Sequence, residues 1–403
     1  MDKTVDKSEG MLVAPSEERL LVITDPQRDR YATMRLIEWW DQERIQAAHV
    51  MVVGAGALGN EVLKNLALLG VGHLFIVDFD TVEAANLTRS VLFRPQDGGR
   101  SKAEVAAERV GAINPDVQAI PFSSDVTRDL GLGLYRRMDV VIGCLDNRAA
   151  RMAVNQACWH MTRPWVDGAL DVMDGLVRVF IPPLGACYEC TMTEQDYALV
   201  NLRYSCPPGF TFTVGRQPTT PMAASIIGAM QVQEAVKLLH RLPVRGGEGI
   251  YYSGATARLT RVAYPTREEC PAHHIYEPIV GLPYGVADLT IGQFLELAQA
   301  HLGAAPTLFL SQKVVTSFYC AACGQEEVIY RPYEAVIPDR VPCPRCGALR
   351  TYDAISSLTA RERPLDVPLA QLGVPPLDVL PVRTSNGWGY FELSADESRV
   401  LPI

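Results

Sequence analysis

Three glycines lie close together where an expected strand meets an expected helix. Gly54, Gly56 and Gly59 form a G-x-G-x-x-G directly after the apolar run His49–Val53. Glycines at this spacing let the backbone approach a phosphate closely, and the following helix offers free N–H groups and the positive end of its dipole. Asp78 follows about 20 residues later, where a carboxylate can accept a ribose hydroxyl. A nicotinamide or flavin oxidoreductase shows the same pattern, and a tight structural turn is the other alternative.

Charged and amide side chains behind Asp78 favour a triphosphate over a nicotinamide. The chain supplies them in this order: Asp80, Asn86, Arg89 and Lys102. Attack of a carboxylate on an α-phosphate builds negative charge on the phosphate oxygens and on the departing pyrophosphate, and fixed cations stabilise that charge. The alternative is that Arg89 and Lys102 are solvated surface residues.

Asp146 follows the apolar run Asp139–Gly143, which is another expected strand. Ligands of doubly wound sheets bind at the carboxyl ends of the strands, and carboxylate oxygens are preferred ligands of Mg²⁺. Asp146 is therefore a candidate magnesium ligand, with helix capping as the alternative.

Close pairs of metal-binding side chains account for most of the ten cysteines. With no export signal at the start of the sequence, such pairs are more often metal ligands than disulfides. Cys187 with Cys190, and Cys270 with His273, have the spacing of zinc knuckles, and Cys₃His is a known structural zinc set. His274 competes with His273 for the fourth position.

A second set has the spacing of a zinc ribbon: Cys320, Cys323, Cys343 and Cys346. Four thiolates leave no open coordination position, so this zinc is expected to be structural. An exposed redox pair is the alternative.

Cys206 is unpaired and lies in the loop-like segment Tyr204–Gly209. A loop thiol can attack an acyl adenylate to form a thioester. A buried or incidental thiol is the alternative.

The elements that position these residues alternate between strands and helices, which predicts an α/β, Rossmann-like, doubly wound and mainly parallel sheet. Residues 1–278 are expected to form an ATP-binding adenylation domain, and 279–403 a smaller C-terminal domain with the zinc ribbon. A ubiquitin-like fold is one expectation for the smaller domain, and a scaffold that completes a dimer is another. The expected strands are 49–53, 73–77, 117–122 and 139–143, with an antiparallel extension at 176–181, 249–253 and 258–264.

Composition excludes several classes of protein. Of 403 residues, 48% are hydrophobic, which is enough for a packed core and too many for disorder. The net charge of −9 argues against nucleic acid as a partner. There is no apolar run of the roughly 18 residues that a membrane span needs, and no secretory segment, so the sequence predicts a cytoplasmic protein.

The sequence resembles the family of ThiF, MoeB and the eukaryotic ubiquitin-activating enzymes. The matching stretches, within about 31–274, are GAGALGNEVLKNLALLGVG, VDFDTVEAANLTRS, SKAE, INP and CLDNRAAR. The resemblance implies ribose binding by Asp78, triphosphate contacts from Asn86, Arg89 and Lys102, and magnesium coordination by Asp146.

The resemblance also implies the two zinc-knuckle pairs as one site, a homodimer, and a thioester-forming cysteine at the position of Cys206. Members carry an arginine two residues after an N-terminal tyrosine. Tyr31 is instead followed by Ala32 and Thr33, and Arg35 is the preferred substitute.

The expected function is ATP-dependent adenylation of the C-terminal glycine carboxylate of a ubiquitin-like protein. Thioester formation on Cys206 and transfer to a conjugating enzyme would follow. A first alternative is a sulfur-carrier-protein adenylyltransferase that stops at the acyl adenylate. The others are a nicotinamide or flavin oxidoreductase and a zinc-dependent interaction scaffold. ATP, Mg²⁺ and two structural Zn²⁺ are the expected cofactors.

Overall fold

A computed structural model describes residues 28–198, 200, 218–336, 341–361 and 365–402. An eight-stranded sheet forms its larger part, in the order β3-β2-β1-β4-β5-β6-β7-β8. The strands from β3 to β5 are parallel, and β6, β7 and β8 continue the sheet antiparallel. The bounds are β1 His49–Val53, β2 His73–Val77, β3 Gln118–Phe122, β4 Val140–Gly143, β5 Trp165–Asp171, β6 Asp174–Phe180, β7 Glu248–Ser253 and β8 Arg258–Ala263.

Helices cover both faces of this sheet because successive side chains of a buried strand point to opposite sides. Val50 and Val52 of β1 join one apolar core with α2, α3 and α7, while Met51 and Val53 join a second core with α4 and α5. The bounds are α1 Gln42–Ala47, α2 Ala57–Leu69, α3 Lys102–Ile113, α4 Leu132–Arg136, α5 Arg148–His160, α6 Glu194–Ala198 and α7 Pro221–Leu239.

The predicted fold class is confirmed, but β5 Trp165–Asp171 was not among the expected strands, and other strands differ slightly at their ends. The third strand begins at Gln118, one residue late, because the Val117 N–H closes a turn onto the Asn114 carbonyl. The fourth begins at Val140, one residue late, and the Asp139 carboxylate accepts the His49 N–H at 2.8 Å.

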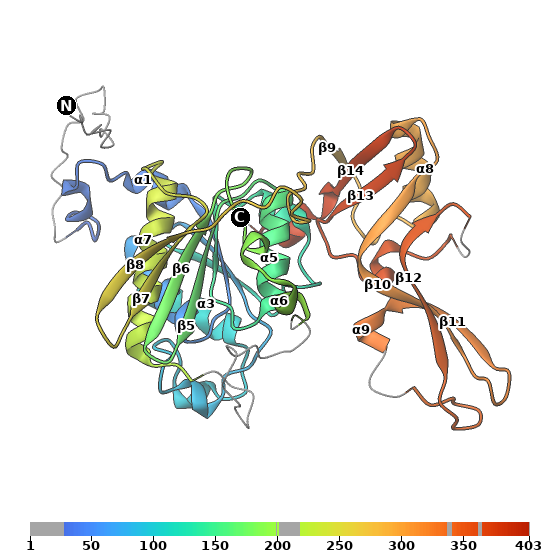
Figure 1. Ribbon diagram of the computed structural model, residues 1–403, viewed down its shortest axis with the longest axis horizontal. Helices are drawn as coiled ribbons and strands as arrows, with labels where there is room; N and C mark the ends of the chain where they lie inside the picture. The colour runs from blue at the N-terminus through green and yellow to red at the C-terminus, as the bar shows by residue number, and fades with distance from the viewer. Residues whose placement is uncertain (1–27, 199, 201–217, 337–340, 362–364, 403) are drawn as a thin grey trace, which may run out of the picture.

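A second sheet follows β8 in the chain and forms the smaller unit at the right of Figure 1. Its order is β11-β10-β13-β14-β9, and β12 also pairs with β10. Helix α8 packs on it over an apolar core that includes Phe294 and Phe391. We call residues 279–402 of this description the C-terminal unit. The bounds are β9 Ile279–Leu282, α8 Ile291–Leu302, β10 Thr307–Tyr319, β11 Glu326–Pro332, α9 Tyr333–Val336, β12 Thr351–Thr359, β13 Val379–Thr384, β14 Gly387–Leu393 and α10 Glu397–Val400.

The predicted boundary at residue 278 lies between β8 and β9. The expectation of a ubiquitin-like fold for the smaller domain stays a prediction. Among the described residues, no helix combines the length and the apolar character needed to cross a bilayer.

Candidate active site

A cavity of about 660 Å³ opens at the carboxyl ends of β1, β2 and β4. It brings together most of the residues that the sequence singled out for nucleotide chemistry. Two predicted site residues do not line it: Gly59, which lies beneath the glycine turn, and Arg35. The predicted residues that line it are Gly54, Gly56, Asp78, Asp80, Asn86, Arg89, Lys102 and Asp146.

Each of the three glycines is suited to its position for a different physical reason. Gly54 has a φ of +96°, a conformation that favours glycine, and a Cβ there would meet the Cys144 carbonyl. A Cβ on Gly59 would collide with the backbone of Gly54, so this glycine lets α2 approach the turn. Gly56 borders open space and leaves the turn accessible from the cavity.

Asn60 fixes the glycine turn from below and was not singled out from the sequence. Its amide donates to the carbonyls of Ala55 at 2.7 Å and Gly56 at 2.9 Å, and its side-chain oxygen accepts the Leu92 N–H. The side chain is fully buried, so each of these bonds is protected from water. A buried amide one residue after the last glycine was the available signal.

Asp78 is held in place by two backbone donors. Its Oδ2 accepts the Ala55 N–H at 2.7 Å, and its Oδ1 accepts the Asp80 N–H at 2.8 Å. Burial raises the pKa of the Asp78 carboxyl, while Lys102 and the two N–H donors oppose that shift. The carboxylate faces the cavity beside the glycine turn, where a hydroxyl donor could reach its remaining lone pairs.

Lys102 lies at the start of α3, and its Nζ is 2.8 Å from Asp80 Oδ2. The lysine is 8% exposed, so its charge is largely withdrawn from water and directed into the cavity. Ser101 caps α3, because its side chain accepts the Glu104 N–H.

Arg89 and Asn86 come from the 3₁₀ turn Ala84–Asn86 and the loop after it. The Arg89 guanidinium donates to the Ala85 carbonyl at 2.9 Å, and Asn86 accepts the Glu83 N–H at 2.9 Å. These local bonds set the shape of the segment and hold both residues at the cavity wall.

Asp146 is exposed at the end of β4, and it is Asn147 that caps α5 by accepting the Ala150 N–H at 2.8 Å. The capping alternative for Asp146 therefore does not hold. The Asp146 carboxylate accepts the Asn147 side-chain amide at 3.2 Å and lines the same cavity as Asp80. Its oxygens have the donor chemistry for Mg²⁺.

A buried ion cluster beneath the cavity was missed by the sequence analysis. Asp167 is fully buried and binds Arg151 at 3.0 Å and Arg178 at 2.5 Å. Arg151 also donates to the carbonyls of Leu145 and Gly168, which both line the cavity. The signal was an acid inside the apolar run of β5, because a buried charge requires a partner.

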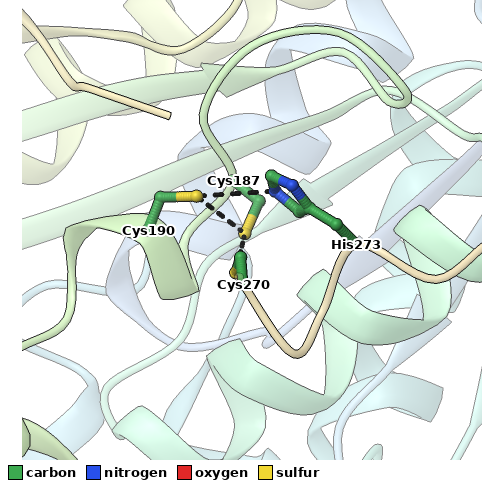
Figure 2. Close-up of side chains that lie close together, drawn as sticks. All are labelled: Cys187, Cys190, Cys270 and His273. Carbon is green, nitrogen blue, oxygen red and sulfur yellow. Dashed lines mark hydrogen bonds between the residues drawn. The ribbon is translucent and has the colours of Figure 1, made fainter. Parts of the chain in front are cut away.

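Cys187, Cys190, Cys270 and His273 converge in one cluster, as Figure 2 shows. We call it the junction cluster. Its Sγ atoms lie 3.7 Å apart for Cys187 and Cys190 and 3.5 Å apart for Cys187 and Cys270, and Cys190 Sγ is 3.4 Å from His273 Nε2. Tetrahedral zinc with bonds near 2.3 Å places its sulfur ligands roughly 3.8 Å apart, whereas a disulfide needs about 2.05 Å. The donor set therefore fits zinc.

His273, and not His274, is the fourth member of the junction cluster. The His274 ring points elsewhere, with its Nε2 2.6 Å from the Tyr390 hydroxyl on β14. His274 thus links the two sheets instead of completing the metal set.

The second predicted set also converges, between the turns that join β10, β11 and β12. We call it the ribbon cluster. Cys320 and Cys346 lie 3.5 Å apart and Cys323 and Cys343 lie 3.6 Å apart, measured between Sγ atoms. Four cysteines at these separations fit a closed structural zinc site.

The remaining candidates are placed as follows. Cys206 lies outside the described residues. Arg35 pairs with Asp29 at 3.0 Å, and its expected reach to a partner's nucleotide stays a prediction. Burial raises the pKa of the thiols of Cys144 and Cys158, as expected for structural cysteines.

Comparison with known proteins agrees with this geometry. A model of the ThiF family matches residues 29–272, which ends before β9. The sulfur carrier protein adenylyltransferase of Thermus thermophilus is 32% identical over 237 residues, covering 57% of this chain and 83% of the relative. The SAMP-activating enzyme E1 of Haloferax volcanii is 31% identical over 249 residues, covering 61% and 88%. The crystal structure of Escherichia coli MccB with ATP aligns with a TM-score of 0.51 at 20% identity over 61% of this chain and 74% of that chain, a likeness of fold.

Proposed function

This chain belongs to the ThiF family, and on that premise we propose that it adenylates the C-terminal carboxylate of a small sulfur-carrier or ubiquitin-like protein. The observation that supports this most is the convergence on one cavity of the glycine turn, Asp78, Arg89, Lys102 and Asp146. An oxidoreductase uses the glycines and the acid, whereas two cations and a further carboxylate that line the same cavity suit a triphosphate and its metal.

Each polar group has a part in the proposed reaction. A carboxylate oxygen of the carrier attacks the α-phosphorus of ATP. The bond from that phosphorus to the oxygen that bridges to the β-phosphate breaks, so that the acyl adenylate forms and pyrophosphate is the leaving group. Asp78 would accept the ribose hydroxyls, and the free N–H groups at the start of α2 would face phosphate oxygens. Lys102 and Arg89 would stabilise the charge that moves onto pyrophosphate.

Asp80 has a second task that follows from its contact with Lys102. In the structure the two groups neutralise each other at 2.8 Å. When a triphosphate binds, Lys102 would exchange this carboxylate for a phosphate oxygen. Asp146, which lines the same cavity as Asp80, would then hold Mg²⁺, which supplies further neutralisation of the phosphates.

The relatives favour a reaction that ends at the acyl adenylate. Two of the relatives, of Thermus thermophilus and Escherichia coli, are named as adenylyltransferases of sulfur carrier proteins. This is the alternative that the sequence analysis placed second to thioester transfer. A conjugating-enzyme partner and a homodimer stay predictions.

Thioester formation on Cys206 is the second candidate, for one reason. Val200 and Thr219, which flank the segment 201–217, both line the cavity. Described residues on both sides of Cys206 in the sequence therefore line the cavity.

Exchange of labelled pyrophosphate into ATP tests the adenylation step, with a carrier that ends in Gly-Gly and with Mg²⁺. Lys102→Ala and Arg89→Ala should each lower kcat by about 10²–10³, the usual effect of removing one donor to developing charge. Lys237→Ala is the matched control, because Lys237 is also paired with an acid, Glu234, but lies on α7 away from the cavity. Wild-type exchange in both cavity variants would contradict the proposal.

Intact-mass analysis in the same mixture separates the two end points. A carrier adduct that is lost on reduction, and is absent from Cys206→Ala, would establish the thioester. Undiminished exchange with no such adduct would leave the acyl adenylate as the product.

A further inference from the structure

The C-terminal unit contacts the larger unit at a short segment next to the nucleotide cavity. Asp378 Oδ1 accepts the Leu132 N–H at 2.9 Å, and the Leu377 carbonyl accepts the Gly133 N–H at 2.9 Å. Asp378 is 6% exposed, and the partners of its carboxylate among the described residues are backbone N–H groups. Two residues of the C-terminal unit, which are far from α4 in sequence, therefore fix its first turn.

Two glycines of the larger unit are required for this contact. A Cβ on Gly131 would come under 3.0 Å from the Pro376 carbonyl, and one on Gly133 would come equally close to the Leu377 carbonyl. Neither glycine has a positive φ, so the backbone conformation does not call for glycine. The close approach of the C-terminal unit accounts for both.

Charged groups reinforce the same contact. Glu392 of β14 is 2% exposed and pairs with both Arg136 and Arg137 at the end of α4. Arg137 also binds Glu397 through two hydrogen bonds, at 2.6 and 2.8 Å. Breaking the pairing of a buried carboxylate leaves an uncompensated charge, which strongly opposes separation of the two surfaces.

The segment before α4 forms part of the cavity wall. Ser124, Asp125, Val126 and Thr127 follow β3 and line the cavity, on the same edge as Asp78. Strand β3 neighbours β2, and the Asp78 N–H donates to the Phe122 carbonyl at 3.0 Å. With phosphates at the glycine turn of β1 and the ribose at Asp78 on β2, the next position along the edge is this segment.

The path from cavity wall to C-terminal unit is short and continuous. Asp125 bonds to Asp129 in both directions, through Asp125 N–H to the Asp129 carboxylate and Asp129 N–H to the Asp125 carbonyl. Val126 packs against the apolar core that also contains Leu377 and Val379. One hydrogen-bonded turn thus separates the nucleotide wall from Gly131.

We propose that the C-terminal unit positions the nucleotide-facing segment 124–127, with Asp378 and Glu392 as the positioning residues, so that loosening this contact weakens ATP binding. The inference rests on the proposed function, because it takes ATP as the ligand of the cavity. It assigns a task to a region that lies beyond the residues matched by the ThiF family.

Calorimetric titration of the full chain with ATP and Mg²⁺ tests the proposal. Asp378→Ala removes the acceptor for Leu132 and should raise the Kd for ATP roughly fivefold. Asp378→Asn keeps a carbonyl oxygen at the same place and should restore the Kd to within about twofold. Gly133→Ala should act like Asp378→Ala, whereas Gly111→Ala is the control, because a Cβ there meets nothing within 4 Å.

Kinetics separate positioning from general damage. In the exchange assay, Asp378→Ala and Gly133→Ala should raise the KM for ATP and leave kcat at saturating ATP within about twofold. Hydrogen exchange of the peptide covering 124–133 should be faster in both variants. If Asp378→Ala does not fold, the same measurements on Glu392→Gln and Gly133→Ala test the positioning role.

Two failures are distinguishable. The positioning role would be overturned if the folded variants kept the wild-type Kd for ATP and the wild-type rate of hydrogen exchange in residues 124–133. A wild-type chain that binds no ATP would instead refute the proposed function itself.

Discussion

The junction cluster and the ribbon cluster bring together nearly the same donors in very different surroundings. In the junction cluster, Cys187 and Cys270 are buried, and the His273 ring stacks on Trp159 of α5 with centroids 3.9 Å apart. In the ribbon cluster, Cys320 and Cys343 are also buried, but Cys346 is exposed. The buried cysteines of the junction cluster belong to an apolar core with Trp159 and Ala272. The cysteines of the ribbon cluster are held mainly by turn hydrogen bonds, such as Cys320 N–H to the Gln325 carbonyl at 2.9 Å. The junction cluster is part of an apolar core. The ribbon cluster would instead hold its turns together through the metal ligands.

The position of each cluster in the fold explains this difference. The junction cluster joins the loop after β6 to the segment after β8, just before the chain crosses to β9 (Figures 1 and 2). The ribbon cluster ends a three-stranded extension, β11-β10-β12, at the far end of the C-terminal unit (Figure 1). The same ligand chemistry should therefore stabilise the whole molecule in one case and a local element in the other.

The largest effect is expected for Cys187→Ser at the junction cluster. Loss of this buried ligand should remove one equivalent of zinc and lower the free energy of unfolding by about 3–5 kcal/mol. Zinc content by mass spectrometry and a thermal or urea unfolding curve would measure both. Full zinc retention, or stability equal to that of the wild type, would contradict a core role for this site.

A smaller effect is expected from protonation of Asp378 at the contact between the two units. Burial raises the pKa of Asp378 to about 6, from an ordinary value of 3.8. The folded state then holds the proton more tightly, so this stabilisation is complete below about pH 4 and is lost as the pH rises through 6. Asp378→Asn has no such dependence. The free energy of unfolding of Asp378→Asn minus that of the wild type should therefore increase by about 1–2 kcal/mol from pH 5 to pH 8.

Urea unfolding of both proteins at the two pH values measures this change. The comparison of variant with wild type cancels the titration of the groups that both chains share. A constant difference between the two proteins across this range would show that Asp378 keeps an ordinary pKa.

The smallest effect is expected for Cys343→Ser at the ribbon cluster, where the measured quantity is the Kd for ATP. Removal of this zinc should disorder the turns of β10–β12, while the Kd for ATP stays within about twofold of wild type. Zinc content should fall by one equivalent, as in Cys187→Ser, which makes the two variants a matched pair. A large loss of ATP affinity in Cys343→Ser would erase the distinction between the clusters.

Local patterns in the sequence predicted much of the eight-stranded sheet and of the nucleotide site. The apolar runs 49–53 and 73–77 are strands with those bounds, because buried parallel strands read as continuous apolar runs. The glycine turn and the end of β4 carry their chemistry within a few residues. Such features need no knowledge of the rest of the chain.

Contacts between distant residues could not be predicted in this way. Asp378 and Leu132 are 246 positions apart, and nothing near either residue marks the other as its partner. Lys102 and Asp80 were both chosen as ligands of the nucleotide, but their pairing with each other depends on how α3 packs beside β2. Asp167 could be recognised as a buried acid, whereas its two arginines come from α5 and β6.

Gly131 and Gly133 limit how freely this architecture could be recombined. Both lie within the region shared with the ThiF family, yet their small size serves residues 376–377, which lie outside it. A chimera that grafts these C-terminal residues onto a relative with larger side chains at the two positions would meet a steric clash at the graft. In a chimera, the larger unit and the C-terminal unit would have to be exchanged together.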